Sequence, residues 1–543
     1  MTVKIINQLF QIHLFVLFGK HICDIKEGFT LKNQSSKLPK IPEPYWRDTV
    51  QLPTHQKLAK NLNVDVAIVG GGITGITAAY LLSKEGLNVA LADSDVLLNG
   101  TTGHTTAKIT VQHDIIYDEL IQHFGAEQAK HYYEANLSGL EFIRKTVNEK
   151  NIECDFTTED AILYAVSDES MKKLLKEKEA YEKLGIPFEF TDKIPLDIEM
   201  QGALIVKNQA QFHPLKYLHT LVQEMSQAGV QIFEKTVIID MKGTEDEPKL
   251  ITNEGFEITC QHVISASHFP FVDGSAFYFA RMYADRSYVV SAKTSKPYPG
   301  GMFLSVDEPK RSLRSATDNG ETVVIIGGEG HKTGQVKDTA RLYENLESFG
   351  ETVFGLNEIT HKWSAQDLFT LDKVPYIGNL TSNHKNIYTA TGFHKWGMTN
   401  GTFAALMLRD LIVKKESLYL DLFTPSRFQS DPSVKEFLKQ NADVAKHLIS
   451  GKINPPSKRP QDLKANEGSP VIFQGKRAGA YKDDKGVLHL VDTTCTHLGC
   501  EVEWNNGDRT WDCPCHGSRF SYSGDVIEGP ADKPLKVLDA ELQ

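Results

Sequence analysis

The stretch VAIVGGGITGITAAYLLSKEGLNVALAD, residues 66–93, decides the fold of the larger part of this chain. A short apolar strand leads into a glycine-rich turn and a helix, and a second apolar strand follows and ends at Asp93. These elements are predicted at residues 66–69, 70–75, 76–82 and 89–92. The order is that of a βαβ unit that binds a dinucleotide, and residues 66–93 are called the fingerprint.

The small residues of the turn have distinct physical tasks. Gly70 permits the tight turn, and Gly72 lets backbone N–H groups reach a pyrophosphate at the N-terminus of the helix. Gly75 lets the helix pack closely against the strand, and Asp93 is placed to accept a hydrogen bond from a ribose hydroxyl. We therefore predict that Gly70, Gly72, Thr74, Gly75 and Asp93 contribute to a cofactor-binding site.

Two short boxes far downstream carry the other strong signal, CTHLGC at residues 495–500 and CPCHGS at residues 513–518. Each box offers one cysteine and one histidine. Together these form the ligand set of a [2Fe-2S] centre, with two cysteines on one iron and two histidines on the other. A structural zinc site uses the same donors and is the alternative, although zinc ligands usually come as CxxC with HxxxH. The predicted metal ligands are Cys495, His497, Cys513 and His516.

Each box also has a second cysteine that has no place among the four ligands. The simplest use for Cys500 and Cys515 is a disulfide that ties the two loops together, and zinc would not explain this pair. Gly499 and Gly517 give the chain room to approach the metal. A third loop, residues 529–531, could close over the cluster from the other side.

The boxes and the Gly-Pro-Ala loop resemble the Rieske family over roughly the last 75 to 80 residues, and the extra cysteines resemble its high-potential branch. In that branch a serine and a tyrosine hydroxyl favour the reduced cluster. Ser518 matches the serine, but Phe520 stands where the tyrosine would be. We therefore expect a potential within the range of roughly −150 to +300 mV, below its upper end.

Three segments extend the dinucleotide signal, GTTGHTTAK at 100–108, DKVPYIG at 372–378 and GFHKWGMTNG at 392–401. With the fingerprint they resemble the D-amino-acid oxidase and glycine oxidase superfamily of FAD enzymes over about residues 40–440. The resemblance implies FAD, with the last segment along the isoalloxazine ring and with a following helix, predicted at 402–411, directed at the flavin. Some members of this superfamily attach FAD covalently through a cysteine near the last segment. No cysteine lies between Cys260 and Cys495 here, so we expect FAD to be bound non-covalently. The further cofactor-binding residues implied are Thr102, Gly103, Thr105, Thr106, Gly378, Gly392, Gly397, Met398 and Asn400.

The predicted fold class follows from these signals and from the length of 543 residues. We expect an α/β or α+β FAD-binding Rossmann-like domain, an interleaved antiparallel β-sheet substrate domain, and a small all-β Rieske domain. The predicted substrate sheet includes 288–290 and 322–326. The predicted segments are an N-terminal non-core extension (1–38), the oxidoreductase (39–445), an extended linker (446–462) and the Rieske domain (463–543), with an extended arm at 41–47.

The pairing of a two-electron carrier with a one-electron carrier predicts the chemistry. We expect an FAD-dependent dehydrogenase that oxidises a small amine or amino-acid-like substrate and passes electrons singly through its own cluster. The external acceptor or donor would be a protein or a quinone. Alternatives are reverse flow, with the cluster feeding the flavin for reductive or oxygenating chemistry, and a non-catalytic redox sensor or electron-transfer adaptor.

Catalytic groups are less clearly marked. His394 and Lys395 are the best candidates, because a cation beside the flavin could hold a carboxylate or raise the flavin potential. His213 is more plausible as a packing histidine. An arginine of the predicted substrate sheet could clamp a substrate carboxylate, although each alone is more plausibly a surface charge. These arginines are Arg281, Arg286, Arg311 and Arg314.

Net charge and cysteine usage limit the expected partners and the expected compartment. A net charge of −11 argues against nucleic acid and against an anionic membrane surface as a main partner. The scattered Cys23, Cys154 and Cys260 fit a reducing cytoplasm. Residues 5–18 are apolar but interrupted by polar side chains, too short for a spanning helix and without a cleavage site. We expect a cytoplasmic protein, with membrane association through this segment as the alternative.

Overall fold

The computed structural model describes residues 37–273, 276–318, 320–428, 430–453 and 456–539. The predicted N-terminal extension, residues 1–38, falls almost wholly outside these ranges. Among the described residues, no helix combines the length and the apolar character that crossing a membrane requires.

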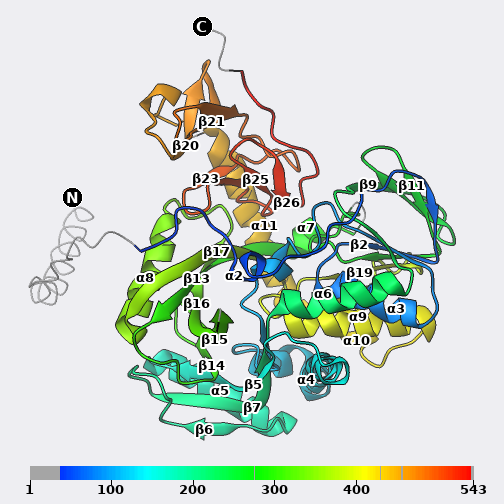
Figure 1. Ribbon diagram of the computed structural model, residues 1–543, viewed down its shortest axis with the longest axis vertical. Helices are drawn as coiled ribbons and strands as arrows, with labels where there is room; N and C mark the ends of the chain where they lie inside the picture. Colours follow the sequence, from blue (N-terminus) through cyan, green and yellow to red (C-terminus); the bar gives the residue numbers. More distant parts are fainter. Residues whose placement is uncertain (1–36, 274–275, 319, 429, 454–455, 540–543) are drawn as a thin grey trace, which may run out of the picture. The chain divides into compact units, whose positions relative to one another are not determined.

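The fingerprint forms the centre of a mainly parallel sheet (Figure 1). All its neighbouring strands pair in parallel except the edge pair β18–β19. The strands, in spatial order, are β18 (Tyr376–Asn379), β19 (Ile387–Thr391), β12 (His262–Ser265), β2 (Val66–Val69), β3 (Val89–Ala92) and β8 (Gln231–Phe233). The predicted βαβ unit is therefore confirmed, and it is buried, as expected for parallel strands.

Helices α3 (Ile73–Lys84) and α9 (Gly397–Val413) pack against this sheet, α6 (Pro214–Gln227) packs on α3, and α4 (Tyr117–Lys150) packs on α9 (Figure 1). A Cβ at Gly75 would lie 1.9 Å from the carbonyl oxygen of Gly70, which explains the glycine where α3 meets the turn after β2. Helix α9 begins at Gly397, earlier than the predicted start at residue 402, so the GFHKWGMTNG segment includes its first turn.

A second, mainly antiparallel sheet is built from strands that alternate in sequence with those of the first. It confirms the predicted interleaved domain, with one parallel pairing, β14 with β5. Its strands, in spatial order, are β17 (Leu356–Thr370), β13 (Met282–Thr294), β16 (Glu321–Lys332), β15 (Arg311–Asp318), β14 (Met302–Ser305), β5 (Thr157–Ala165), β7 (Gly202–Gln211) and β4 (Lys108–Ile109), with β6 (Glu189–Thr191) on β7. Helices α5 (Asp168–Leu184) and α8 (Ala340–Phe354) pack against it.

Short elements complete the oxidoreductase part. A small sheet consists of β1 (Leu62–Asn63), β11 (Glu257–Thr259), β10 (Pro248–Thr252) and β9 (Ile238–Gly243), and single turns of helix form η1 (Thr101–His104), α7 (Tyr278–Arg281) and α10 (Leu420–Phe423). The predicted extended arm at 41–47 is wrong in its second half, because Tyr45–Asp48 forms the helical turn α2. Tyr45 and Trp46 are buried there, and the gain from burying two aromatic rings outweighs an extended path.

The predicted Rieske domain, called the cluster domain from here on, consists of two small antiparallel sheets (Figure 1). One contains β20 (Glu467–Phe473), β21 (Lys476–Lys482) and β22 (Leu488–Val491), and the other β23 (Glu503–Asn505), β24 (Thr510–Asp512), β25 (Arg519–Ser521) and β26 (Val526–Glu528). Trp504 and Trp511 face each other across β23 and β24, with ring centroids 4.8 Å apart. This all-β fold is the one predicted.

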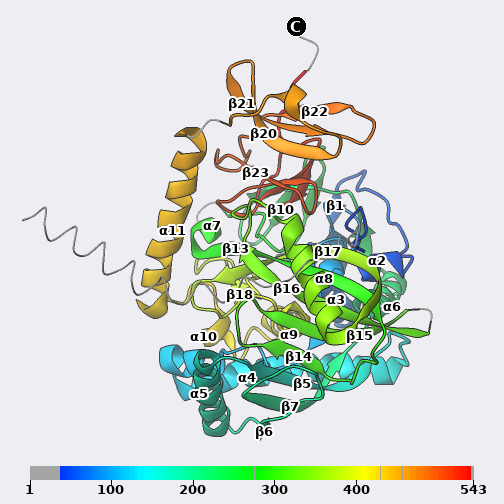
Figure 2. The same cartoon turned by 90° about the vertical axis from the view of Figure 1, so that its left-hand side faces the viewer.

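The predicted extended linker is wrong in its first part. Helix α11 (Ser430–Ile453) continues through residues 446–453, and η2 (Pro460–Asp462) follows before β20. Figure 2 shows the course of α11 toward the cluster domain. Val444 and Leu448 of α11 pack against the core of this domain. These contacts give the helix an apolar partner that its sequence alone does not reveal.

Candidate functional site

One cavity of about 1250 Å³ reaches all three parts of the fold. It begins at the carboxyl ends of β2, β3, β8 and β12, where doubly wound sheets bind ligands. It continues over one face of the second sheet and ends at the cluster domain, where His497 and residues 526–532 form part of its wall. A dinucleotide, a small substrate and a cluster ligand could therefore share one cavity.

The fingerprint residues line the first part of this cavity, and their side chains also organise it. The Asp93 carboxylate accepts hydrogen bonds from the backbone N–H groups of Gly71, at 2.6 Å, and Asp95, at 2.8 Å. Burial raises the pKa of Asp93. Thr102 accepts from the N–H of Ile73, at 3.1 Å, so it caps the first turn of α3.

The predicted cofactor residues divide into two groups. Gly70, Gly72, Thr74, Asp93, Thr102, Thr105, Thr106, Gly397 and Met398 line the cavity. Gly75, Gly103, Gly378, Gly392 and Asn400 lie behind this wall. A Cβ at Gly103 would lie 2.2 Å from the carbonyl oxygen of Leu98, and one at Gly392 would lie 2.4 Å from Thr370 Cγ2. These glycines let segments behind the wall pack closely.

The two catalytic candidates differ in their surroundings. His394 lies 3.1 Å from the Thr370 hydroxyl and packs on Phe369, and burial lowers its pKa to about 3. It is therefore neutral and cannot supply the expected cation. Lys395 lines the cavity with its ammonium 2.7 Å from Asp285 Oδ1. Burial opposes its charge, but Asp285 and Asp367 raise its pKa.

None of the four predicted arginines lines the cavity. The placement of Arg281 in the substrate sheet is wrong, because Arg281 ends α7, just before β13 begins. Arg314 is buried and donates to the carbonyl oxygens of Thr106 and Ala107, at 3.1 and 2.7 Å, which fixes the GTTGHTTAK segment. Arg311 pairs with Glu329 at 2.7 Å, and Arg281 donates to Pro425 O. The interpretation as surface charges is wrong for Arg286 and Arg314, whose side chains are buried.

His213 likewise does not line the cavity and has a structural role. It caps α6 by accepting from the N–H of Lys216, and its ring packs on Trp46 at 5.0 Å. Burial lowers its pKa to about 3. This placement fits the expected packing histidine.

The four predicted metal ligands lie as two pairs, Cys495 with Cys513 and His497 with His516. The thiols of Cys495 and Cys513 lie within hydrogen-bonding reach of each other, which lowers the pKa of Cys495 to about 7. Backbone N–H groups of the two boxes point at both sulfurs. The rings of His497 and His516 lie 5.0 Å apart, and burial lowers the pKa of both, so the rings are neutral, as metal ligands must be.

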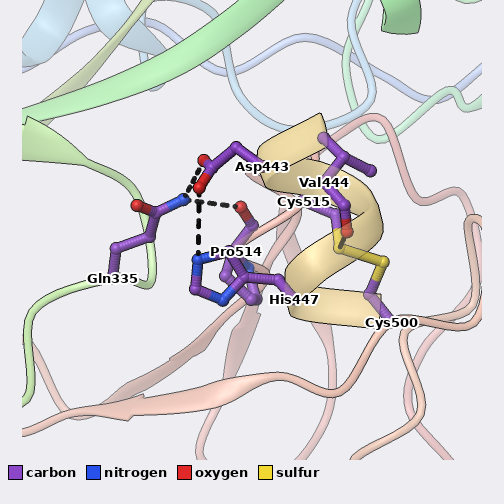
Figure 3. Close-up of a disulfide and its surroundings, with 7 residues drawn as sticks. All are labelled: Gln335, Asp443, Val444, His447, Cys500, Pro514 and Cys515. Atoms are coloured by element: carbon purple, nitrogen blue, oxygen red, sulfur yellow. Dashed lines mark hydrogen bonds and ion pairs between the residues drawn. A yellow bond between two sulfur atoms is a disulfide. The ribbon is translucent and has the colours of Figure 1, made fainter. Parts of the chain in front are cut away.

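Cys500 and Cys515 form a disulfide between the two boxes (Figure 3). The backbone of Val444 on α11 lies against it, with 3.9 Å between Cys515 Sγ and the carbonyl oxygen. Gln335 donates to Asp443, at 2.8 Å, and to the Pro514 carbonyl, at 3.4 Å. The disulfide and these contacts tie the second box to α11 and to the second sheet.

Ser518 and Phe520 follow the second box. The Ser518 hydroxyl accepts from the N–H of Ala531, at 3.0 Å, which holds the Gly-Pro-Ala loop beside the ligand loops. It also contacts the Cys495 thiol. Phe520 is fully buried. Because its ring carries no hydroxyl, no hydrogen bond reaches the sulfurs from this position.

The histidine side of the cluster site faces the oxidoreductase part. The ring of Phe279, on α7, lies 6.1 Å from that of His497 and 5.6 Å from that of His516. Phe269, which lines the cavity, lies 6.4 Å from His497. Sequence reasoning missed both phenylalanines, because nothing near them in the chain indicates a metal site.

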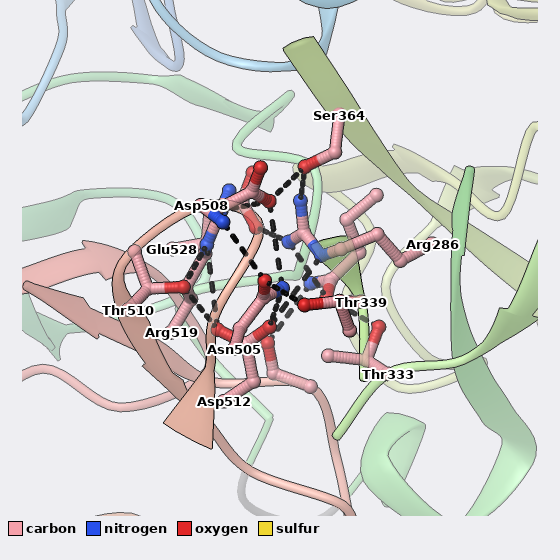
Figure 4. A network of polar contacts seen from close by, with 12 residues as sticks. Arg286, Thr333, Thr339, Ser364, Asn505, Asp508, Thr510, Asp512, Arg519 and Glu528 are labelled. Atoms are coloured by element: carbon pink, nitrogen blue, oxygen red, sulfur yellow. Dashed lines mark hydrogen bonds and ion pairs between the residues drawn. The ribbon is translucent and has the colours of Figure 1, made fainter. Parts of the chain in front are cut away.

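A buried polar network joins the cluster domain to the second sheet (Figure 4). Arg286 on β13 pairs with Glu528 on β26 and donates to Ser364, at 2.8 Å. Asp508 accepts from Tyr343 at 2.7 Å and pairs with Arg519. The network buries charges from both parts, and each charge has an opposite partner, the condition under which buried charges are tolerated.

Gln366 on β17 is the most direct bridge between the two predicted cofactor sites. Its side chain donates to the carbonyl oxygen of Gly517, at 3.0 Å, next to the ligand His516. Its own carbonyl oxygen accepts from Thr101, at 3.2 Å, in the GTTGHTTAK segment. No sequence signal marked Gln366.

Both predicted cofactors fit these sites. At the dinucleotide end, a Cβ on Gly72 would lie 3.0 Å from Thr102 Oγ1, in the turn where a pyrophosphate would approach. At the other end, backbone N–H groups are directed at a pair of thiols, and the rings of two neutral imidazoles lie 5.0 Å apart. These are the donors of a two-iron centre, and zinc would need no disulfide beside them.

Comparison with known proteins agrees with this geometry. A family model described as FAD dependent oxidoreductase (DAO) matches residues 65–411, and a Rieske [2Fe-2S] domain model matches residues 455–539. The chain is 49% identical over 500 residues to YhfW of Bacillus subtilis (strain 168), whose name describes a Rieske 2Fe-2S iron-sulfur protein. That match covers 92% of this chain and 98% of the relative.

Other relatives and solved structures match only part of the chain. Gamma-glutamylputrescine oxidoreductase of Escherichia coli (strain K12) is 22% identical over 371 residues, 65% of this chain and 85% of that protein. The structure of glycine oxidase from Geobacillus kaustophilus is similar in fold, with a TM-score of 0.58 at 18% identity, covering 68% of this chain and 100% of that chain. The chain belongs to the DAO family of FAD-dependent oxidoreductases and carries a Rieske [2Fe-2S] domain, so FAD and a [2Fe-2S] cluster are its cofactors.

Proposed function

We propose that this protein oxidises a small amine or amino-acid-like substrate and passes the electrons singly through its own cluster to an external acceptor. One observation carries the proposal. The fingerprint turn, the face of the second sheet and the ligand His497 line the same cavity. A substrate between the flavin site and the sheet would therefore be oxidised close to a one-electron outlet.

One set of residues would hold FAD, and a second set would hold the cluster. Bound FAD supplies a hydride acceptor that can release its electrons one at a time. The backbone of the 70–74 turn would hold the pyrophosphate at the N-terminus of α3, and the segments at 100–108 and 392–401 would hold the rest of the cofactor. Cys495, His497, Cys513 and His516 would hold the cluster, with the histidines toward the oxidoreductase part.

The packing of the cluster site supports electron transfer between the two parts of the chain. His497 and His516 lie against Phe279, and the network around Arg286 and Glu528 holds the cluster domain to the second sheet. This arrangement supports transfer within one chain. The partner of the cluster would be a protein or a quinone that accepts single electrons.

Anaerobic titration with a panel of primary amines, amino acids and hydroxy acids tests the proposal. We expect the flavin absorbance to bleach with at least one amine or amino acid, and the electron paramagnetic resonance signal of the reduced cluster to appear in step. A C495S control should lose the cluster signal but keep the bleaching. Bleaching without any cluster signal, or no bleaching by any compound, would contradict the proposal.

A further inference from the structure

Two carboxylates face each other on the cavity side of the second sheet. Asp285 on β13 and Asp367 on β17 are directly opposite in the antiparallel register. Both line the cavity, as do Ser287 and Phe369, two residues further along the same faces. Like charges directly opposite across strands are destabilising, so this pair is a cost to the sheet that requires an explanation.

The two carboxylates have different partners. Asp285 accepts from the Lys395 ammonium at 2.7 Å. Among the described residues, no hydrogen bond or ion pair reaches the carboxylate of Asp367, which lies in the wall of the cavity. Burial raises the pKa of Asp367 to about 7, Lys395 opposes this rise, and Asp285 adds to it. One carboxylate is thus neutralised by the chain, and the other is left to meet what enters the cavity.

The cations of the cavity are mostly committed to carboxylates of the protein. Lys310 lies 2.8 Å from Asp114, and Lys373 pairs with Glu119. Lys108 is the exception, because within the part of the chain that the structure describes its amine donates only to the Phe303 carbonyl oxygen, at 2.6 Å. Burial, together with nearby Arg314, lowers its pKa to about 7. None of the four predicted arginines lines the cavity, and Arg519, which does, pairs with Asp508 and Asp512. Among the described residues, no arginine of the cavity wall is therefore left without a carboxylate partner to clamp a substrate carboxylate.

We propose that Asp367 binds the ammonium group of a cationic amine substrate and accepts a proton from it. This inference rests on the proposed function and specifies its substrate class as amines recognised by their positive charge. In the proton transfer one N–H bond breaks and one O–H bond forms on Asp367, while the electron pair stays on nitrogen. The neutral amine is the form from which a hydride can leave the adjacent carbon. Lys395 holds the charge of Asp285 in place, which keeps the opposite carboxylate free.

The charged groups around Asp367 set the sign of its pH dependence. Lys395 faces it from the segment before α9, Asp285 and Arg286 from β13, and Glu528 from the cluster domain. An ionised Asp367 attracts an ammonium ion, and a protonated one does not. Ammonium binding should therefore weaken by up to about tenfold per pH unit as the pH falls below about 7.

Calorimetry on the protein loaded with FAD and cluster tests this without turnover. The probes are n-butylammonium, tetramethylammonium, which has no proton to give, and butyrate. We expect both cations to bind, each with the same release of protons from the fraction of Asp367 that is protonated, because transfer from n-butylammonium moves a proton only within the complex. We expect butyrate not to bind. Asp367→Asn should weaken both cations at least tenfold and remove the pH dependence. Glu308→Gln, which removes another cavity carboxylate, should leave binding unchanged.

The outcomes separate the two proposals. Unchanged flavin absorbance and cluster signal in Asp367→Asn would show that the variant is folded. Equal cation binding by Asp367→Asn and the parent would overturn the inference. So would butyrate binding that Lys108→Met abolishes and Asp367→Asn leaves intact. Amines that bind through Asp367 but never bleach the flavin would instead contradict the proposed function and leave the ammonium site standing.

Discussion

At the scale of single residues, the two ligand boxes contain glycines in equivalent positions that do different work. Gly499 and Gly517 both have positive φ, +76° and +81°. A Cβ at Gly499 would meet open space, whereas one at Gly517 would lie 2.4 Å from Ala284 Cβ. Only the second box approaches the oxidoreductase part so closely that a side chain is excluded.

The first prediction compares these two glycines. Gly499→Ala should cost about 1 to 2 kcal/mol through its left-handed backbone alone. Gly517→Ala should cost a further 1 to 3 kcal/mol, roughly, because the methyl group overpacks the contact with Ala284. Thermal unfolding of the loaded protein measures both. Equal losses would mean that the close approach of the second box is absent in solution.

Ser518 carries the second prediction at this scale. Its hydroxyl contacts the Cys495 thiol, and hydrogen bonds to ligand sulfurs favour the reduced cluster. Ser518→Ala should lower the cluster midpoint potential by about 60 mV, the equivalent of a tenfold change for one electron. Phe520→Tyr is the matched variant and should raise it. Redox titration followed by electron paramagnetic resonance measures both, and a potential unmoved by Ser518→Ala would refute the role of the hydroxyl.

At the scale of elements, β13 and β26 are joined through Arg286 and Glu528. Burial opposes ionisation of Glu528, but Arg286 and Arg519 lower its pKa to about 2. Because the folded-state pKa is depressed, its stabilising contribution is present above about pH 4.3 and is lost as the pH falls toward 2. The contact of these two strands is therefore electrostatic.

Arg286→Met tests this contact. Removing one partner of a buried ion pair leaves an uncompensated charge and should cost about 3 to 5 kcal/mol. The double variant R286M/E528M should recover part of that loss, because neither charge then remains. Denaturant unfolding near neutral pH provides the comparison. Additive losses in the double variant would show that the two side chains do not interact.

At the scale of the whole molecule, the two cofactor sites share one cavity and one buried network. Electron transfer from flavin to cluster should then occur within each chain. After rapid mixing with a reducing substrate, the rate of cluster reduction should not change with protein concentration or with solvent viscosity. A rate proportional to protein concentration would indicate transfer between chains.

Much of this protein was predictable from the sequence by itself, because the signals are local. The strand, the glycine turn and Asp93 lie within 66–93, and the ligand boxes each span six residues. Backbone turns and metal ligands at such short spacing need no distant partner to be recognised. The fold class, the cluster ligands and the Cys500–Cys515 disulfide follow from them, whereas FAD was implied by the resemblance of further segments to a superfamily of FAD enzymes.

Only the tertiary structure decided how these parts meet. The register that sets Asp285 against Asp367, the pairing of Arg286 with Glu528 and the placement of Phe279 beside His497 and His516 join residues far apart in the chain. Helix α11 continues beyond the predicted boundary because the cluster domain offers it an apolar surface. Such contacts depend on strand register and on domain packing, which are set by the burial of many distant side chains together and leave no local pattern to read.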